Sequence, residues 1–96
     1  MSVLIVGGNE CMERQYADLC KQYRCKAKVV TKSSGAVNVG SPDLVVLFTA
    51  TMSHKMLRSV LSETKGKNVQ IERCHSSSMS ALRSILQTRV GAVGNV

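Results

Sequence analysis

Short runs of apolar residues alternate along the chain with longer segments in which apolar residues recur every three or four positions. Runs of the first kind are typical of buried parallel strands, and segments of the second kind are typical of amphipathic helices. Four runs are predicted to be strands, namely Val3–Val6, Ala27–Val30, Leu44–Phe48 and Val69–Ile71. Strands that alternate with helices predict one parallel sheet with right-handed crossovers.

Each segment with helical spacing follows a residue that can cap a helix. Asn9 precedes a helix predicted over Glu10–Arg24, Ser53 precedes a second helix, and Ser76 or Ser77 precedes a third. The residues expected to face inward on the second and third helices are Leu57, Val60, Leu61, Met79, Leu82, Ile85 and Leu86.

These elements predict an α/β fold: a single three-layer parallel sheet of about four strands, in the flavodoxin-like or Rossmann-like order 2-1-3-4. Residues 1–88 are expected to form one ligand-binding domain. The stretch 33–41 is rich in serine, glycine and small residues, which favours a loop or an irregular crossover. Residues 89–96 form a tail that is an edge strand, a dimer arm or disordered. A domain of 96 residues buries a low fraction of its surface, so a homodimer is expected to add stability.

The net charge of +7 favours an anionic partner, such as a phosphate ligand, a cofactor carboxylate or nucleic acid. The basic residues are scattered and no aromatic pair is available for base stacking, so nucleic-acid binding rests on charge alone. Because the N-terminus lacks the pattern of a signal peptide and no run is long enough to span a membrane, we expect a cytoplasmic protein. Its four cysteines are then reduced thiols.

Candidate site residues follow three of the predicted strands, and the carboxyl ends of parallel strands meet at one edge of a sheet, where ligands bind. These residues are Gly8 and Asn9 after the first strand, Ser53 and His54 after the third, and Arg73 and Cys74 after the fourth. Thr49 and Thr51 also follow the third strand at this edge. The first and third strands flank the switch in chain direction, so we expect Gly8 and His54 to border the same crevice.

The glycine pair Gly7-Gly8 invites comparison with dinucleotide-binding turns, but the further glycines of that fingerprint are missing. The second strand ends in Thr31-Lys32 instead of the acid that would hold a ribose. A glycine required by the turn itself is the favoured explanation. A small anion could bind at the helix starts without any motif, because their backbone N–H groups lack partners; alternatively the serines only cap their helices.

His54 is the candidate metal ligand, because the positive end of a helix disfavours the imidazolium and a neutral imidazole can bind iron. The alternative is a surface histidine without function. Cys74-His75 could contribute to a soft site, although the cysteine spacing fits no zinc module. A redox-sensing role for Cys11 or Cys74 is a further alternative. No pair of carboxylates accompanies His54, which favours binding or sensing over catalysis.

Several short motifs resemble the bacterial domain-of-unknown-function family 2325 over nearly the whole chain. They are Val3-Leu4-Ile5-Val6-Gly7-Gly8, Arg14-x-Tyr16, Ser53-His54, and Arg73 followed by Ser78-x-Ser80-x-Leu82. The resemblance implies a small cytosolic Rossmann-like domain with site residues at Arg14, Tyr16, His54 and Arg73, and an association with haem binding and gas sensing. The chain departs from the family at Cys74-His75-Ser76, where members more usually carry small polar residues.

The first hypothesis is therefore a haem-linked gas or redox sensor with His54 as the axial ligand. Arg14, Lys55, Arg58 or Arg73 would meet the propionates, and Met12, Met52, Met56 and Met79 would line an apolar slot. Few aromatic residues and the small size argue against one copy enclosing a porphyrin. The second hypothesis is an anion-, phosphate- or nucleotide-binding regulatory module without catalysis. The third is a basic protein associated with nucleic acid.

Overall fold

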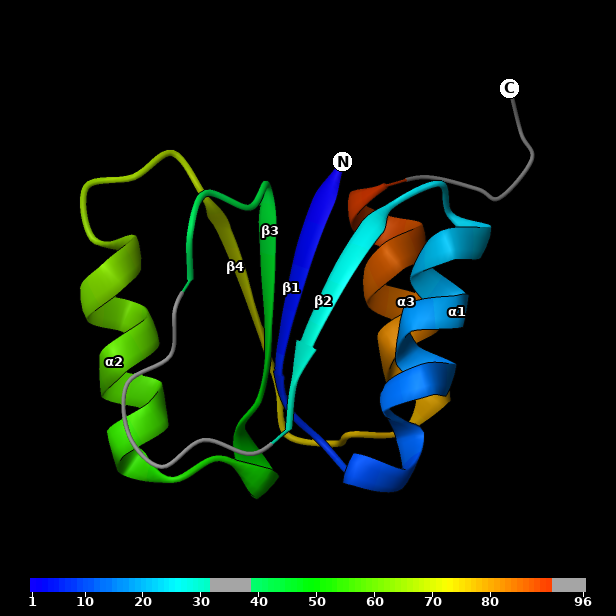
Figure 1. Ribbon diagram of the computed structural model, residues 1–96, viewed down its shortest axis with the longest axis horizontal. Helices are drawn as coiled ribbons and strands as arrows, with labels where there is room; N and C mark the ends of the chain where they lie inside the picture. The colour runs from blue at the N-terminus through cyan, green and yellow to red at the C-terminus, as the bar shows by residue number, and fades with distance from the viewer. Residues whose placement is uncertain (32–38, 91–96) are drawn as a thin grey trace.

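The protein is built around one parallel four-stranded sheet with helices on both faces (Figure 1). The computed structural model describes residues 1–31 and 39–90. Their elements are β1 (Ser2–Gly7), the 3₁₀ helix η1 (Glu10–Met12), α1 (Glu13–Gln22), β2 (Lys26–Val30), β3 (Leu44–Phe48), the 3₁₀ helix η2 (Thr49–Thr51), α2 (His54–Thr64), β4 (Gln70–Cys74) and α3 (Met79–Arg89). The strand order is β2-β1-β3-β4, which confirms the predicted fold class and order.

The two central strands carry the most apolar sequence because both of their faces are covered. Every residue of β3 is buried, as is every residue of β1 after Ser2. The strands pair in register from Val3 with Leu44 to Gly7 with Phe48. The outer strands β2 and β4 have no fully buried residue, as expected for strands with one free edge.

Alternation along the strands creates two separate cores, since successive side chains point to opposite faces. In β1, Val3 and Ile5 join the core under α1 and α3, while Leu4 and Val6 join the core under α2. Figure 1 shows α1 and α3 side by side on one face and α2 alone on the other. All three helices begin at the edge where the strands end, so this edge gathers every helix start.

Helix starts follow the predicted capping, with one correction. The Asn9 side chain accepts from the N–H of Cys11 and the Ser53 hydroxyl accepts from the N–H of Met56. The third helix is capped by Ser78, not by Ser76 or Ser77. The reason lies in β4, which continues to Cys74, beyond the predicted strand end at Ile71, and so moves the connecting loop along the chain.

The first predicted helix is divided and ends early. Residues 10–12 form η1, and α1 stops at Gln22, short of Arg24. Arg24 adopts a left-handed conformation with φ of 58°, and the N–H of Cys25 donates to the carbonyl of Cys20. This pattern is a Schellman C-cap, which usually places glycine at the left-handed position.

The inward faces of α2 and α3 follow the predicted spacing with an offset in α2. In α2, Met56, Val60 and Thr64 are buried, and the expected Leu57 and Leu61 are half-buried beside them. In α3, Leu82 and Leu86 are buried, and Met79 and Ile85 pack against the same core.

The boundary of the predicted tail falls close to the end of α3. Arg89 is the last residue of α3, and its guanidinium forms an ion pair with Glu72 of β4, with 2.6 Å between Nη2 and Oε2. Val90 packs against the core under α1 and α3. Residues 91–96 lie outside the described residues, and so do residues 32–38 of the predicted loop, so the alternatives for both segments stay predictions.

Across residues 1–31 and 39–90, none of the helices has the length and apolar character needed to cross a membrane.

Candidate functional site

The candidate site lies at the edge formed by the carboxyl ends of the strands. After β1 the chain passes to α1 on one face, and after the neighbouring β3 it passes to α2 on the other face (Figure 1). The connections therefore diverge between β1 and β3, which is the topological switch point where α/β domains place their ligands. The glycine turn after β1 and η2 after β3 border this point.

The glycine turn is packed against the protein's own residues. Gly7 and Gly8 have φ of 91° and 90°, a region that side chains rarely adopt. A Cβ on Gly7 would lie 2.7 Å from the carbonyl oxygen of Phe48 and 2.9 Å from Met52 Cγ. A Cβ on Gly8 would lie 2.8 Å from the ring of Tyr16. The positive φ values agree with the favoured explanation that the turn itself requires glycine, and close packing against this chain's own residues is a second reason for it.

A hydroxyl from η2 bridges the two strand ends. The backbone N–H of Gly8 donates to Thr51 Oγ1 over 2.5 Å, and the Thr51 hydroxyl donates to the carbonyl of Phe48 over 3.0 Å. Thr51 is an exposed residue at the switch point, and η2 contacts both β1 and β4. The sequence places Thr51 at this edge, after the third strand, but does not assign it a binding role. Its hydrogen bonds to both strand ends are visible only in the structure.

His54 is the first residue of α2 and is exposed at this edge. The neighbouring Lys55 is also exposed, and Ser53 caps the helix. The first turns of α2 and α3 contain no acidic residue, whereas α1 begins with Glu13. The positive end of α2 therefore has a histidine and a lysine beside it instead of a compensating carboxylate.

Tyr16 is fully buried and joins three segments below the edge. Its hydroxyl donates to the carbonyl of Ser77 over 2.6 Å, and its ring lies 5.4 Å from the ring of Phe48. The same ring covers Gly8. Tyr16 therefore holds α1, the glycine turn and the loop before α3 together.

Some of the predicted site residues contact one another in the structure, and others do not. Tyr16 contacts Gly8, and Gly8 is bonded to Thr51, so the glycine turn forms one connected unit with η2. Arg14 and Arg73 are exposed on α1 and β4. Among residues 1–31 and 39–90, no hydrogen bond or ion pair links either arginine to His54, and the Asn9 side chain is used in capping η1.

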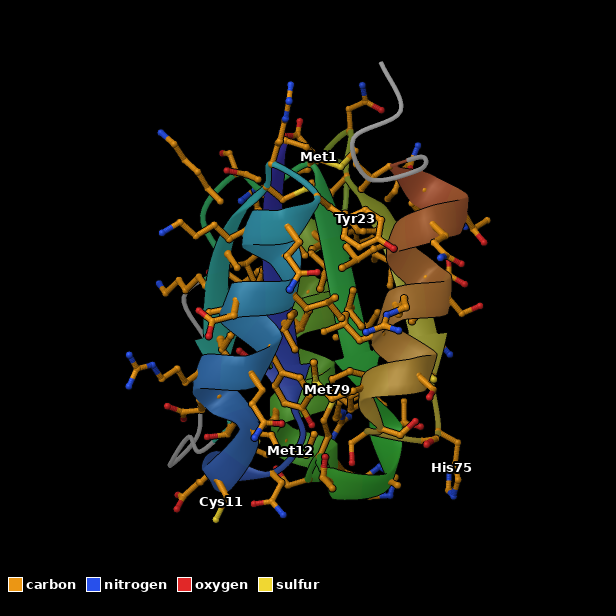
Figure 2. All side chains as sticks on the ribbon, turned by 90° about the vertical axis from the view of Figure 1, so that its right-hand side faces the viewer. Met1, Cys11, Met12, Tyr23, His75 and Met79 are labelled. Carbon is orange, nitrogen blue, oxygen red and sulfur yellow. The ribbon has the colours of Figure 1, made fainter. Side chains whose placement is uncertain are left out.

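Cys74 and His75 do not form a shared ligand site. The Cys74 thiol donates to the carbonyl of Ser76 over 3.1 Å, and His75 is exposed and points away from the body of the domain (Figure 2). Within the described part of the chain, no group of three histidine, cysteine or acidic residues could hold a metal ion.

The other cysteines differ in their surroundings. Cys11 is exposed in η1 (Figure 2), while Cys20 and Cys25 are buried at the end of α1. Burial raises the pKa of the Cys20 thiol to about 12, with Cys25 adding to the shift, and burial also raises the pKa of Cys25. Cys20 belongs to the core under α1 and α3.

Comparison with known protein families identifies one family that matches this chain. The sequence model of a family described as uncharacterized proteins conserved in bacteria, DUF2325, matches residues 2–89. The chain belongs to the DUF2325 family. This confirms the resemblance seen in the sequence motifs. Searches of curated proteins and of solved structures found no match.

The fit of a haem to this DUF2325 domain can be judged from the side chains that would contact it. Met12 and Met79 pack against the core under α1 and α3 (Figure 2), and Met52 and Met56 pack against the core under α2. These methionines fill the protein's own cores, and the His54 side chain is exposed. In the described residues of one copy, this arrangement does not fit a porphyrin, which requires an apolar slot beside the ligating imidazole.

A cavity of about 300 Å³ lies at the opposite edge of this DUF2325 domain, where the strands begin. It is lined by Ser2, Val3, Leu4, Lys26, Ala27, Lys28, Val39, Gly40, Ser41 and Pro42. It is therefore separate from His54 and from the glycine turn.

Proposed function

We propose that this DUF2325 domain is a non-catalytic regulatory module that binds a small anion, such as phosphate, at the start of α2. The observation that carries the proposal is the electrostatic character of that helix start. His54 and Lys55 are exposed there, at the switch point of the sheet, and the first turn contains no acid. A helix N-terminus combines unpaired N–H groups with a partial positive charge, both of which favour anions.

The contrast with α1 supports this choice of helix. Glu13 stands in the first turn of α1, and its carboxylate also accepts from the hydroxyl of Thr31. A carboxylate in this position stabilises a helix by about 0.3–1 kcal/mol. The first turn of α2 has no such carboxylate, so an external anion can supply the same stabilisation there. The net charge of +7 also raises the local concentration of anions.

Three of the six acidic residues are engaged in structural contacts, which supports a binding role over catalysis. Glu13 is bonded to Thr31, Glu72 is paired with Arg89, and Asp43 accepts from the N–H of Ser2 at the opposite edge. These three carboxylates have structural partners away from His54. We also propose a cytoplasmic location, because the four cysteines are free thiols.

A phosphate titration followed by two-dimensional NMR of the amide groups tests the proposal, with chloride as the control at equal ionic strength. We expect saturable shifts at the amides of His54 and Lys55, because these groups open α2 and the next amide, that of Met56, already donates to the Ser53 hydroxyl. Shifts confined to the cavity-lining residues at the opposite edge, or no saturable shift below about 10 mM, would refute it.

Two further titrations compare the proposal with the other hypotheses. If added haem produces a Soret band that is lost in His54→Ala, the ligand is haem and not an anion. Tight, steeply salt-dependent binding of a DNA duplex would favour a nucleic-acid partner.

The proposed anion site requires one copy of the chain only. Among the described residues, Met1 is the only large hydrophobic residue that is exposed, so the expected homodimer stays a prediction.

A further inference from the structure

The backbone amide of the glycine turn has an internal hydrogen-bond partner at the place where other α/β domains bind phosphate. In dinucleotide-binding folds the turn after the first strand lets the backbone approach a pyrophosphate closely. Here the N–H of Gly8 is bonded to Thr51 Oγ1 at 2.5 Å. The acceptor oxygen comes from the protein itself.

The space above the turn is also filled. A Cβ built on Gly7 would meet Met52 Cγ at 2.9 Å and Thr51 Oγ1 at 3.0 Å. On Gly8 it would meet the hydroxyl oxygen of Tyr16 at 2.9 Å. A pyrophosphate oxygen needs at least as much room as a Cβ. It therefore cannot take these positions beside the α-carbons while Thr51, Met52 and Tyr16 keep theirs.

The Thr51 hydroxyl is held by a second bond that fixes its orientation. Its single hydrogen is donated to the carbonyl of Phe48 over 3.0 Å, so its lone pairs face the N–H of Gly8. Phe48 is the last residue of the fully buried β3, which makes this anchor rigid. Thr51 nevertheless lies at the exposed edge, one residue from Met52 and two from the cap of α2.

We infer that Thr51 determines ligand specificity: by occupying the Gly8 amide it excludes dinucleotides and pyrophosphate from the glycine turn and limits the site to a single compact oxyanion at the start of α2. The inference rests on the proposed anion site and names its ligand class. It also explains why the chain has a glycine turn without the remaining features of a dinucleotide site.

The test is isothermal titration with orthophosphate, pyrophosphate and NAD⁺, at constant ionic strength, of the wild type and three Thr51 variants. In the wild type, we expect pyrophosphate to bind no tighter than orthophosphate and NAD⁺ to bind more weakly than either. Thr51→Ala frees the Gly8 amide and opens space beside it. Its affinity for pyrophosphate should rise about tenfold or more, the effect of one hydrogen bond to a charged group.

The other two variants separate hydrogen bonding from space. Thr51→Ser keeps the hydroxyl and should keep the wild-type preference. Thr51→Val removes the acceptor but leaves a methyl group in its place, so it should be less stable without gaining pyrophosphate affinity. Circular dichroism confirms folding, and the NMR signal of the Gly8 amide should respond to pyrophosphate in Thr51→Ala alone.

The possible results separate the role of Thr51 from the proposed anion site. Pyrophosphate or NAD⁺ binding to the wild type ten times tighter than orthophosphate overturns the role of Thr51, even if Thr51→Ala fails to fold. A folded Thr51→Ala without increased pyrophosphate affinity also overturns it. A wild type without any response to orthophosphate, together with a gain in Thr51→Ala, overturns the proposed function and supports the role of Thr51. No binding to any variant overturns both.

Discussion

Reversing the charge of Lys55 should stabilise the protein while removing its response to phosphate. Lys55 is the second residue of α2 and lies exposed at the positive end of the helix. One charge at a helix terminus contributes about 0.3–1 kcal/mol, so replacing a cation with an anion changes the free energy of unfolding by about 0.6–2 kcal/mol. Lys55→Glu is therefore expected to be more stable than the wild type and to repel phosphate.

Lys65→Glu is the matched control, because Lys65 is the exposed C-cap of the same helix. Both variants lower the net charge by two, from +7 to +5. The 11 residues of α2 extend over about 16 Å, which exceeds the Debye length of about 10 Å at 0.1 M salt. A carboxylate at the C-terminus opposes the helix dipole, so this variant should lose about the stability that the other gains and retain phosphate binding.

Urea unfolding followed by circular dichroism measures the two stabilities, and thermal unfolding with and without phosphate measures the ligand response. Phosphate at ten times its dissociation constant should stabilise the wild type and Lys65→Glu by about 1.4 kcal/mol. The reasoning is refuted if Lys55→Glu is less stable than the wild type, or if it keeps the full phosphate response. Equal effects of the two variants would show that net charge, not the helix start, attracts the anion.

Three predictions concern stability. Arg24→Gly should raise the free energy of unfolding by about 1 kcal/mol in urea, because glycine adopts the left-handed C-cap of α1 without strain; an unchanged midpoint would contradict this. Tyr16→Phe keeps the ring but leaves the carbonyl of Ser77 without its donor, so a loss of about 1–3 kcal/mol is expected, and a neutral effect would show that water replaces the hydroxyl. Cys20 has a folded pKa of about 12 against 9.0 in an unfolded chain, so the unfolded state loses its proton first, and stability should fall as pH rises from about 9 towards 12. Cys20→Ala should weaken this pH dependence of the urea midpoint; an unchanged slope would assign it to other groups.

The elements that the sequence predicted well are those in which local pattern and tertiary burial agree. The apolar run of β3 could only be a strand covered on both faces, and it is buried throughout. Asn9 and Ser53 stand alone before their helices, so their capping roles were unambiguous, and both form the expected bonds. The hydrophobic pattern also predicted that His54 lies at the edge formed by the carboxyl ends of the strands.

The cap of α3 was missed because local chemistry allowed three answers. Ser76, Ser77 and Ser78 can each cap a helix, and nothing in their immediate neighbours distinguishes them. The choice depends on how far β4 pairs with β3 and on the carbonyl of Ser77 accepting from Tyr16, which is 61 residues away in sequence. Such long-range contacts have no local signature.

The sequence by itself determined the strand order, the edge that gathers the helix starts, and the excess of positive charge, because these follow from periodicity, chain connectivity and composition. Only the tertiary structure decided what occupies the glycine turn. The Gly7-Gly8 pair indicates a sharp turn in any context, but Tyr16 and Thr51 reach it from separate segments, 8 and 43 residues from Gly8. Their packing makes the turn a closed part of the protein, because one hydroxyl takes the amide that a phosphate would otherwise bind.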